Sequence, residues 1–382
     1  MKRRMKKIVA LLSVAALAVS LAAGCGSGSD SSSDSGSKKT SSAKGATSTE
    51  MTSEEIIKQA ASEGKVGNWG LGNEYEIEAL LEKYGQPTDY LSQAFDVDGF
   101  DNDDITLASA MTFNELGLVK NDYDGGYGYG DTVGTIDMND EGVAMLEDNI
   151  FCTKDFAQKN PNTVKAFIYA SIKGWQYACE HPDEAAEIVY KYGSSVSADH
   201  QKYMAEQVAK LVTTDMNGNT VTNIGEMSDD EMNQTLELAK KYIKLDDSAA
   251  AEKLQATTLD SFRDTSYYTA AAASADGTDL GTPEKSSVSI QLKWLPQAQF
   301  MGYYVAKDKG YYDEVGLSVD IVSGGGDISE TTAVNNGTVD FGVTWVSNTI
   351  AANAGGMNLV EVAQIYQRSG LQLVYKYDNF QK

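Results

Sequence analysis

The hydrophobic residues from position 51 onward alternate between short apolar runs and stripes at helical spacing. The stretch TSEEIIKQAASEG at 52–64 combines a Thr or Ser start signal, an apolar stripe and a final Gly, which predicts a capped helix. The run DITLASAM at 104–111 predicts a strand, because most of its residues are apolar. Four stretches between 160 and 245 each carry a start signal and an apolar stripe, so we predict helices there. Short strands followed by helices are typical of the α/β fold class.

The periodicity is lost at 266–285, SYYTAAAASADGTDLGTPEK, and we predict a linker there. The α/β pattern then resumes with a strand at 287–292 and a helix at 299–309, which read like the opening of a protein. The last apolar strand, LQLVYKYD at 371–378, is followed by no helix. This order of segments suggests a circular permutation; a mis-assembled or rearranged gene product is the alternative.

The first residues predict a targeting segment. Basic residues precede an apolar run at 8–22, which ends in small residues before Cys25. The sequence LAAGC resembles a lipobox, where a bacterial signal peptidase cuts before a lipid-modified cysteine; an ordinary cleaved signal with a chance cysteine is the alternative. We therefore expect residues 1–25 to be a lipoprotein signal and Cys25 to anchor the protein on the extracytoplasmic face of the bacterial cell membrane. The Ser- and Gly-rich residues 26–50 predict a flexible tether.

Composition narrows the range of partners. The formal net charge of −24 argues against nucleic acid or anionic lipid as a partner. Cys152 and Cys179 either pair or stay as two buried thiols. The only histidines, His181 and His200, are expected at helix surfaces, and no spacing typical of metal ligands occurs, so we expect no metal site. We expect a monomer.

The stretch LKWLPQAQFMGYYVAKDKGYYDEVGLSVDIVSGGGDI at 292–328 closely resembles the first lobe of thiamine-precursor-type periplasmic binding proteins. These are substrate-binding subunits of ABC importers, related to sulfonate- and taurine-binding proteins. The resemblance continues through VDFGVTWVSNTIAANAGGMNLVEVAQIYQRSGLQLV at 339–374. In the family, segments like those at 64–175 would come next, whereas here they stand earlier in the chain. The resemblance covers nearly everything from Gly64 to Asp378, in rotated order.

The resemblance implies a type II periplasmic-binding-protein fold, an α/β fold with two lobes and a ligand cleft, circularly permuted. We expect the new break to fall where the family chain crosses between lobes, so that one of two connecting strands is cut. The expected parts are lobe two at 51–135, the helical part of lobe one at 136–265, the linker at 266–285 and the strand-rich part of lobe one at 286–382.

Candidate ligand-binding residues in lobe one lie at strand ends, where open α/β sheets bind their ligands. Trp294 offers a flat face for stacking, as the equivalent Trp does in the family, and Gln297 and Gln299 offer amides that can pair with a ring; the alternative for Trp294 is a cap on the core. Trp345 ends VDFGVTW and is either pocket wall or core. Tyr303 is adjacent to a second tyrosine on a helix, and we expect Tyr303 to lie nearer the ligand.

Candidate residues in lobe two come from two turns. The turn NWGLGNE places Trp69, Asn73 and Glu74 at the start of a helix, where Glu74 would also suit the helix dipole. The turn AMTFNEL places Asn114 and Glu115 after a strand. Glu115 matches the family's ligand-binding glutamate by position, and a carboxylate there could accept a hydrogen bond from an exocyclic amine and pair with a protonated ring nitrogen.

The resemblance implies a binding protein that delivers a planar heterocycle, such as a thiamine pyrimidine precursor, to an ABC permease in the membrane, without catalysis or cofactor. Riboflavin or a sulfonate-type ligand is the nearest alternative. The superfamily also includes fungal-type pyrimidine synthases, which use pyridoxal phosphate on a lysine and a sacrificial histidine. No histidine lies near Trp294 in the sequence, so we do not expect an enzyme. A ligand sensor for a separate membrane receptor is a third possibility.

Overall fold

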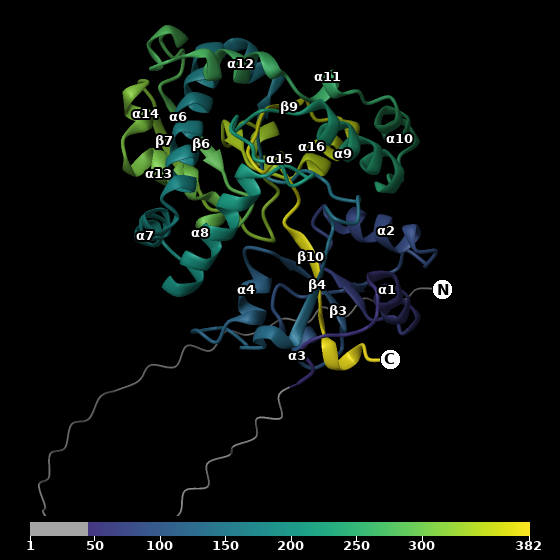
Figure 1. The fold of residues 1–382 in the computed structure, drawn as a ribbon. Coiled ribbons are helices and arrows are strands. Elements are labelled where there is room, and N and C mark those ends of the chain that lie inside the picture. Colours follow the sequence, from purple (N-terminus) through teal and green to yellow (C-terminus); the bar gives the residue numbers. More distant parts are fainter. Residues whose placement is uncertain (1–44) are drawn as a thin grey trace, which may run out of the picture. The chain divides into compact units, whose positions relative to one another are not determined.

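The computed structural model describes residues 45–382, and Figure 1 shows how their helices and strands are arranged. It confirms the α/β fold class, with two five-stranded sheets and helices around them. Their strand orders are β2-β1-β3-β10-β4 and β7-β6-β8-β5-β9. The predicted signal, Cys25 and most of the predicted tether lie outside the described residues. Among residues 45–382, no helix combines the length and apolar character needed to cross a membrane.

The first sheet is mixed. Its strands β1 and β3 run parallel, and β10 lies antiparallel between β3 and β4. The predicted capped helix at 52–64 is α1, where Thr52 and Glu55 form a capping box. The strands are β1 (Val66–Asn68), β2 (Leu91–Ser92), β3 (Leu107–Met111), β4 (Val133–Asp137) and β10 (Leu371–Lys376), and the helices of this half are α1 (Ser53–Ser62), α2 (Glu74–Lys83), α3 (Asp98–Asp101) and α4 (Glu115–Lys120).

The second sheet has three parallel strands, β7, β6 and β8, followed by β5 and β9, with β5 antiparallel to both β8 and β9. Its strands are β5 (Asn149–Thr153), β6 (Ser287–Gln291), β7 (Ser318–Val322), β8 (Phe341–Gly342) and β9 (Leu359–Gln364). The helices are α5 (Lys154–Lys159), α6 (Pro161–Glu180), α7 (Pro182–Tyr192), α8 (Ala198–Thr213), α9 (Asp229–Tyr242), α10 (Ser248–Gln255), α11 (Leu259–Phe262), α12 (Thr265–Ala273), α13 (Met301–Asp308), α14 (Tyr311–Glu314), α15 (Glu330–Asn335) and α16 (Val346–Ala354).

Helices α6 and α13 pack closely against each other, and this contact fixes α13, the helix that follows strand β6. A Cβ added at Gly174 would lie 2.2 Å from the carbonyl oxygen of Gly302. A Cβ added at Gly302 would lie 2.1 Å from the ring of Trp175. Only glycine allows the two helices this separation.

Two segments run from one sheet to the other, which corrects the expected cut. Residues 138–148 connect β4 in the first sheet to β5 in the second, and residues 365–370 connect β9 in the second to β10 in the first. Both connections are intact. The prediction that 286–382 belongs wholly with lobe one was also wrong, because β10, yellow in Figure 1, pairs with β3 and β4. Its Leu373 and Val374 are buried between those strands and extend their core.

The segment predicted as a linker, 266–285, is folded against the protein. Helix α12 occupies its first half and packs on α6 and β9. The run is rich in Ala, the strongest helix former, but lacks the polar–apolar period on which the prediction relied. At its other end, the Glu284 carboxylate accepts hydrogen bonds from the backbone N–H groups of Asn162 and Thr163, in the first turn of α6.

The first and last described residues lie side by side. The N–H of Ala46 donates to Asp378 Oδ1 over 2.8 Å, and the Gln381 amide donates to the Ser48 carbonyl over 3.0 Å. Lys382 forms an ion pair of 3.1 Å with Glu55 on α1. The two ends of the described chain are therefore joined by hydrogen bonds and an ion pair.

Candidate functional site

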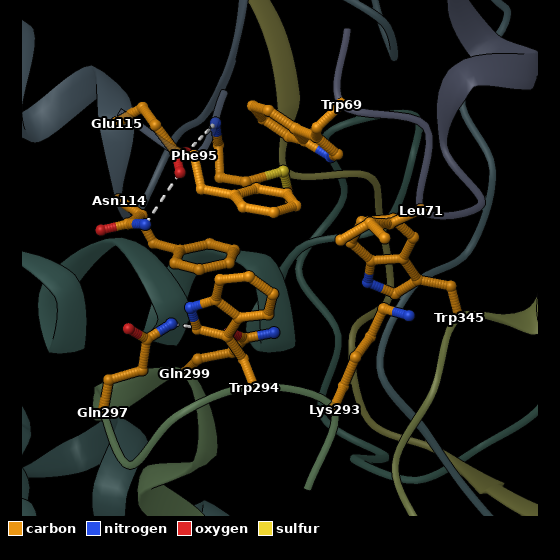
Figure 2. A pocket seen from close by; sticks show the side chains of 12 residues that line it. Trp69, Leu71, Phe95, Asn114, Glu115, Lys293, Trp294, Gln297, Gln299 and Trp345 are labelled. Atoms are coloured by element: carbon orange, nitrogen blue, oxygen red, sulfur yellow. Dashed lines mark hydrogen bonds between the residues drawn. The ribbon is translucent and has the colours of Figure 1, made fainter. Parts of the chain in front are cut away.

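A pocket lies at the carboxyl ends of strands from both sheets and holds about 440 Å³ of empty space, counting its open mouth (Figure 2). Ligand sites in open α/β sheets occur at such strand ends. Each lining residue ends or follows a strand: β1, β2 and β3 in the first sheet, β6 and β8 in the second. The lining residues are Trp69, Leu71, Phe95, Met111, Phe113, Asn114, Glu115, Lys293, Trp294, Gln297, Gln299 and Trp345.

Aromatic side chains from the two halves meet across the pocket. The rings of Phe95 and Trp294 are 5.0 Å apart in an edge-to-face arrangement. Phe95 is 52% exposed, which is unusual for so large an apolar side chain. Exposed aromatic faces beside a pocket favour a ligand with a flat, apolar surface.

Glu115 forms one polar end of the pocket (Figure 2). Its Oε2 accepts the backbone N–H of Met111 and its Oε1 accepts the side-chain amide of Asn114, each over 2.9 Å. The side chain is buried, and burial raises the pKa of Glu115 above its ordinary value, while these hydrogen bonds oppose the rise. The carboxylate keeps lone pairs free to accept hydrogen bonds from a ligand.

Lys293 forms the opposite polar end (Figure 2). Its Nζ lies 3.1 Å from Glu330 Oε1 and 4.3 Å from the ring centre of Trp345. Glu330 also accepts a short hydrogen bond from the Thr344 hydroxyl. Both partners of the ion pair are less than 10% exposed, so the pair is held in place by its surroundings.

Asp148 lies behind the pocket wall and orients two of its side chains. Its carboxylate accepts the Gln299 amide over 2.9 Å and the Trp345 indole N–H over 3.1 Å. Burial raises the pKa of Asp148 to about 7, and the hydrogen bonds from Gln299 and the nearby Lys293 charge partly offset this. Gln297 in turn donates to Gln299 over 2.8 Å, so the amides of this wall form one bonded chain.

Seven of the ten predicted site residues line this one pocket, although those of the first half of the chain stand about 180 positions or more before those of the second half. From the first half of the chain these are Trp69, Asn114 and Glu115, and from the second half Trp294, Gln297, Gln299 and Trp345. The two turns AMTFNEL and LKWLPQAQF therefore face a common cavity.

Three predicted residues do not line the pocket. Tyr303 is 1% exposed and packs edge-on against Trp175, because its side of α13 faces α6 rather than the strand end. Asn73 is buried and bonds to Asn68, and Glu74 accepts the Gly72 N–H over 2.6 Å at the start of α2. These two therefore hold the turn in shape.

Sequence reasoning missed five lining residues, Leu71, Phe95, Met111, Phe113 and Lys293. Lys293 precedes Trp294 directly and follows a buried strand, so its position at a strand end was a usable signal. Phe95 lies in a loop whose path no local pattern indicates.

One polar residue, His200, differs from its predicted setting. His200 was predicted at the surface and is fully buried behind Asn114, since its ring is enclosed by the turn after β3 and by α8, whereas His181 is exposed. Cys152 and Cys179 are both unpaired thiols. Within the described range, no group of three or more His, Cys, Asp or Glu side chains is arranged to hold a metal ion.

The fold and the pocket together define an α/β protein with an aromatic-lined site between two sheets. Residues 54–185 and 297–380, more than half of the 382-residue chain, match the family described as NMT1/THI5 like. The chain belongs to the NMT1/THI5-like family. It is similar to the proteins named 4-amino-5-hydroxymethyl-2-methylpyrimidine phosphate synthase THI11 and THI5 of Saccharomyces cerevisiae, with 27% identity over 88 residues in each case. The matched stretch covers 23% of this chain and 26% of each yeast protein, about a quarter of the curated relatives' length.

Proposed function

We propose that this protein is the extracytoplasmic, lipid-anchored substrate-binding subunit of an ABC importer and that it binds a small planar heterocycle such as a thiamine pyrimidine precursor. The observation that carries the proposal is the meeting of Trp294 and Glu115 in one pocket. A stacking face beside a buried carboxylate suits an aromatic ring that presents N–H donors at its edge.

The polar ends of the pocket define the ligand further. Glu115 accepts hydrogen bonds, whereas the ammonium group of Lys293 donates them and has one donor committed to Glu330. The two groups stand on opposite sides of the pocket (Figure 2). A matching ligand carries an amine at one end and a hydroxyl, carbonyl or similar acceptor at the other, with a flat ring between them.

The proposal includes a two-lobed molecule that closes over its ligand. Contacts between the two halves flank the pocket: the Ser347 hydroxyl donates to the Gly72 carbonyl over 2.6 Å, and the Asn348 amide donates to the Leu71 carbonyl over 3.1 Å. The two chain connections between the sheets would serve as hinges.

The proposal also includes a circular permutation. Residues 45–50 bond to residues 378–382, so a family chain could continue directly from the second group to the first. Segment 266–285 would then be the added connection between the family's original ends. Surface termini that lie close together make such a rotation physically possible.

A synthase is the second candidate, because the curated relatives carry that name and a lysine lines the pocket. The pocket residues fit pyridoxal phosphate poorly. The Lys293 Nζ is held 3.1 Å from the buried Glu330 carboxylate and over the Trp345 ring, so it is not presented freely to a cofactor in the pocket. At the neighbouring glycine turn, Gly72 N–H already donates to Glu74, so that amide is not free for a phosphate.

The test is direct binding. Isothermal titration with 4-amino-5-hydroxymethyl-2-methylpyrimidine should give saturable binding, and Trp294→Ala and Glu115→Gln should each weaken it at least tenfold without unfolding the protein. Glu252→Gln, at an exposed position on α10, is the matched control and should bind like wild type. Binding of riboflavin or of sulfonates alone in a thermal-shift panel would overturn the pyrimidine assignment, and formation of the pyrimidine phosphate from pyridoxal phosphate would overturn the transport role.

A further inference from the structure

His200 is fully buried on α8, and both of its ring nitrogens are hydrogen-bonded. Its Nδ1 lies 2.5 Å from the hydroxyl of Tyr123, and its Nε2 lies 2.9 Å from Oδ1 of Asn114. Asn114 lines the pocket and donates its side-chain amide to Glu115. A continuous hydrogen-bonded chain therefore runs from Tyr123 through His200 and Asn114 to the pocket carboxylate.

The direction of each bond in this chain follows from its two ends. Glu115, when ionised, only accepts, so Asn114 must present its NH₂ to Glu115 and its Oδ1 to His200. His200 Nε2 must then carry the proton, which leaves Nδ1 to accept the O–H of Tyr123. Burial lowers the pKa of His200 to about 4 and raises that of Tyr123 to about 12, so at neutral pH the imidazole has one N–H and the phenol keeps its proton.

The reverse arrangement is self-consistent but meets a penalty at the pocket. If the imidazole proton were on Nδ1, Nε2 would be an acceptor and the Asn114 amide would have to rotate by half a turn. Asn114 Oδ1 would then take the place of the amide nitrogen, which lies 2.9 Å from Oε1 of Glu115. Two acceptors at that distance repel each other, and a buried polar atom is left without a partner.

We propose that His200 is a specificity-determining residue that acts by positioning: it fixes the orientation of the Asn114 amide and so keeps Glu115 available as an acceptor for the ligand's N–H groups. His200 lies about 90 positions from Asn114 in the sequence and belongs to the other half of the molecule. Helix α8, which carries His200, also contacts the turn after β3 through Tyr203, whose hydroxyl donates to the Thr112 carbonyl over 2.7 Å.

This inference rests on the proposed function for its consequence but not for its geometry. An ionised Glu115 with a fixed neighbour accepts N–H donors, whereas a flipped Asn114 would withdraw one hydrogen bond from the carboxylate and favour its protonated form. A protonated Glu115 offers a donor in place of one acceptor. Loss of His200 should therefore lower the preference for an amino-substituted ring more than it lowers affinity in general.

The geometry is tested without a ligand. The chain has only two histidines, so a two-bond ¹H–¹⁵N spectrum of protein labelled with ¹⁵N-histidine contains two imidazole patterns, which His181→Phe assigns. At pH 7, His200 should show the neutral ring with the proton on Nε2, and Asn114→Ala should alter its pattern. A proton on Nδ1, or a charged ring, would overturn the inference whatever the protein binds.

The consequence is tested with two probes, 4-amino-5-hydroxymethyl-2-methylpyrimidine and the same ring without its amino group. Wild type should prefer the amino form, and His200→Phe, which keeps a ring of similar size without either nitrogen, should reduce the ratio of the two affinities about tenfold. His200→Gln, which keeps a donor for Asn114, should recover part of the ratio, and His181→Phe should leave it unchanged. An unchanged ratio in His200→Phe would refute the positioning role. Failure of wild type to bind either probe would refute the proposed function, while the tautomer result would still decide the hydrogen-bonded chain.

Discussion

Replacing Lys293 by Met removes one partner of the buried ion pair at the base of the pocket. Met keeps a side chain of similar length but leaves the Glu330 carboxylate, which is 9% exposed, with only the Thr344 hydroxyl as a donor. Breaking one side of a buried pair costs about 3–5 kcal/mol, because an uncompensated charge stays in a poorly solvated site. The Thr344 bond offsets part of this, so we expect a loss of about 3 kcal/mol in the free energy of unfolding.

The neutralised double variant separates the missing charge from a packing defect. Lys293→Met combined with Glu330→Gln leaves no buried charge, and Gln can still accept the Thr344 hydroxyl. The double variant should be within about 1 kcal/mol of wild type, although each single variant costs about 3 kcal/mol. The sum of the two single-variant losses minus the loss in the double variant is the coupling energy of the pair.

Urea denaturation followed by tryptophan fluorescence and by circular dichroism measures these free energies. Lys58→Met is the matched control, since Lys58 pairs with Glu54 on the surface, where the side chains are 47% and 52% exposed. It should cost less than about 0.5 kcal/mol. If Lys293→Met destabilised the protein no more than Lys58→Met does, the charges of the Lys293–Glu330 pair would be as well solvated as those of a surface pair.

Two further predictions concern the pocket wall and the helix crossing. Because the folded-state pKa of Asp148 is raised to about 7, the folded protein binds more protons than the unfolded chain between pH 4 and 7, and stability should fall as pH rises through that window. Asp148→Asn should make the fall smaller when unfolding is measured at pH 4.5 and 7.5; an unchanged difference would contradict the assignment. Gly302→Ala places a methyl group 2.1 Å from Trp175 and should cost at least about 3 kcal/mol, whereas Gly355→Ala, whose nearest neighbour would be 3.4 Å away, should cost under about 1 kcal/mol. Equal thermal midpoints for the two variants would show that α6 and α13 can separate.

Local pattern predicted the helices and strands well and their grouping less well. The capped helix at 52–64 was identified because Thr52 and Glu55 stand at the spacing of a capping box, which depends only on neighbours. The sheet that β10 joins depends instead on pairing with β3, more than 250 positions earlier, and no local period contains that information. The helix in 266–285 was missed because an Ala-rich run has helical propensity without an amphipathic stripe.

The residues of the site also divide into those that local pattern predicts and those whose position depends on distant parts of the chain. Trp294, Glu115 and Trp345 were found because they follow strands, and the ends of strands meet at one edge of a sheet. Tyr303 was misplaced because the choice between two adjacent tyrosines depends on where α6 lies. His200 was misjudged for a related reason: its partners Tyr123 and Asn114 come from the other half of the molecule, so nothing in its own helix indicates burial.

The contacts around the pocket limit how a ligand can reach it. Bonds between the two halves stand on both flanks, from Ser347 to Gly72 on one side and from Tyr203 to Thr112 on the other, and Phe95 meets Trp294 between the halves. In the lobe closure that we propose, a ring that stacks on Trp294 displaces Phe95, and the halves separate before the ligand binds. Each neutral hydrogen bond contributes about 1 kcal/mol net, and a handful of them holds a closed state by only a few kcal/mol. A free-energy difference of that size between the closed and open states leaves the open state populated at a few per cent or less. Ligand contacts made by both halves are then sufficient to restore closure.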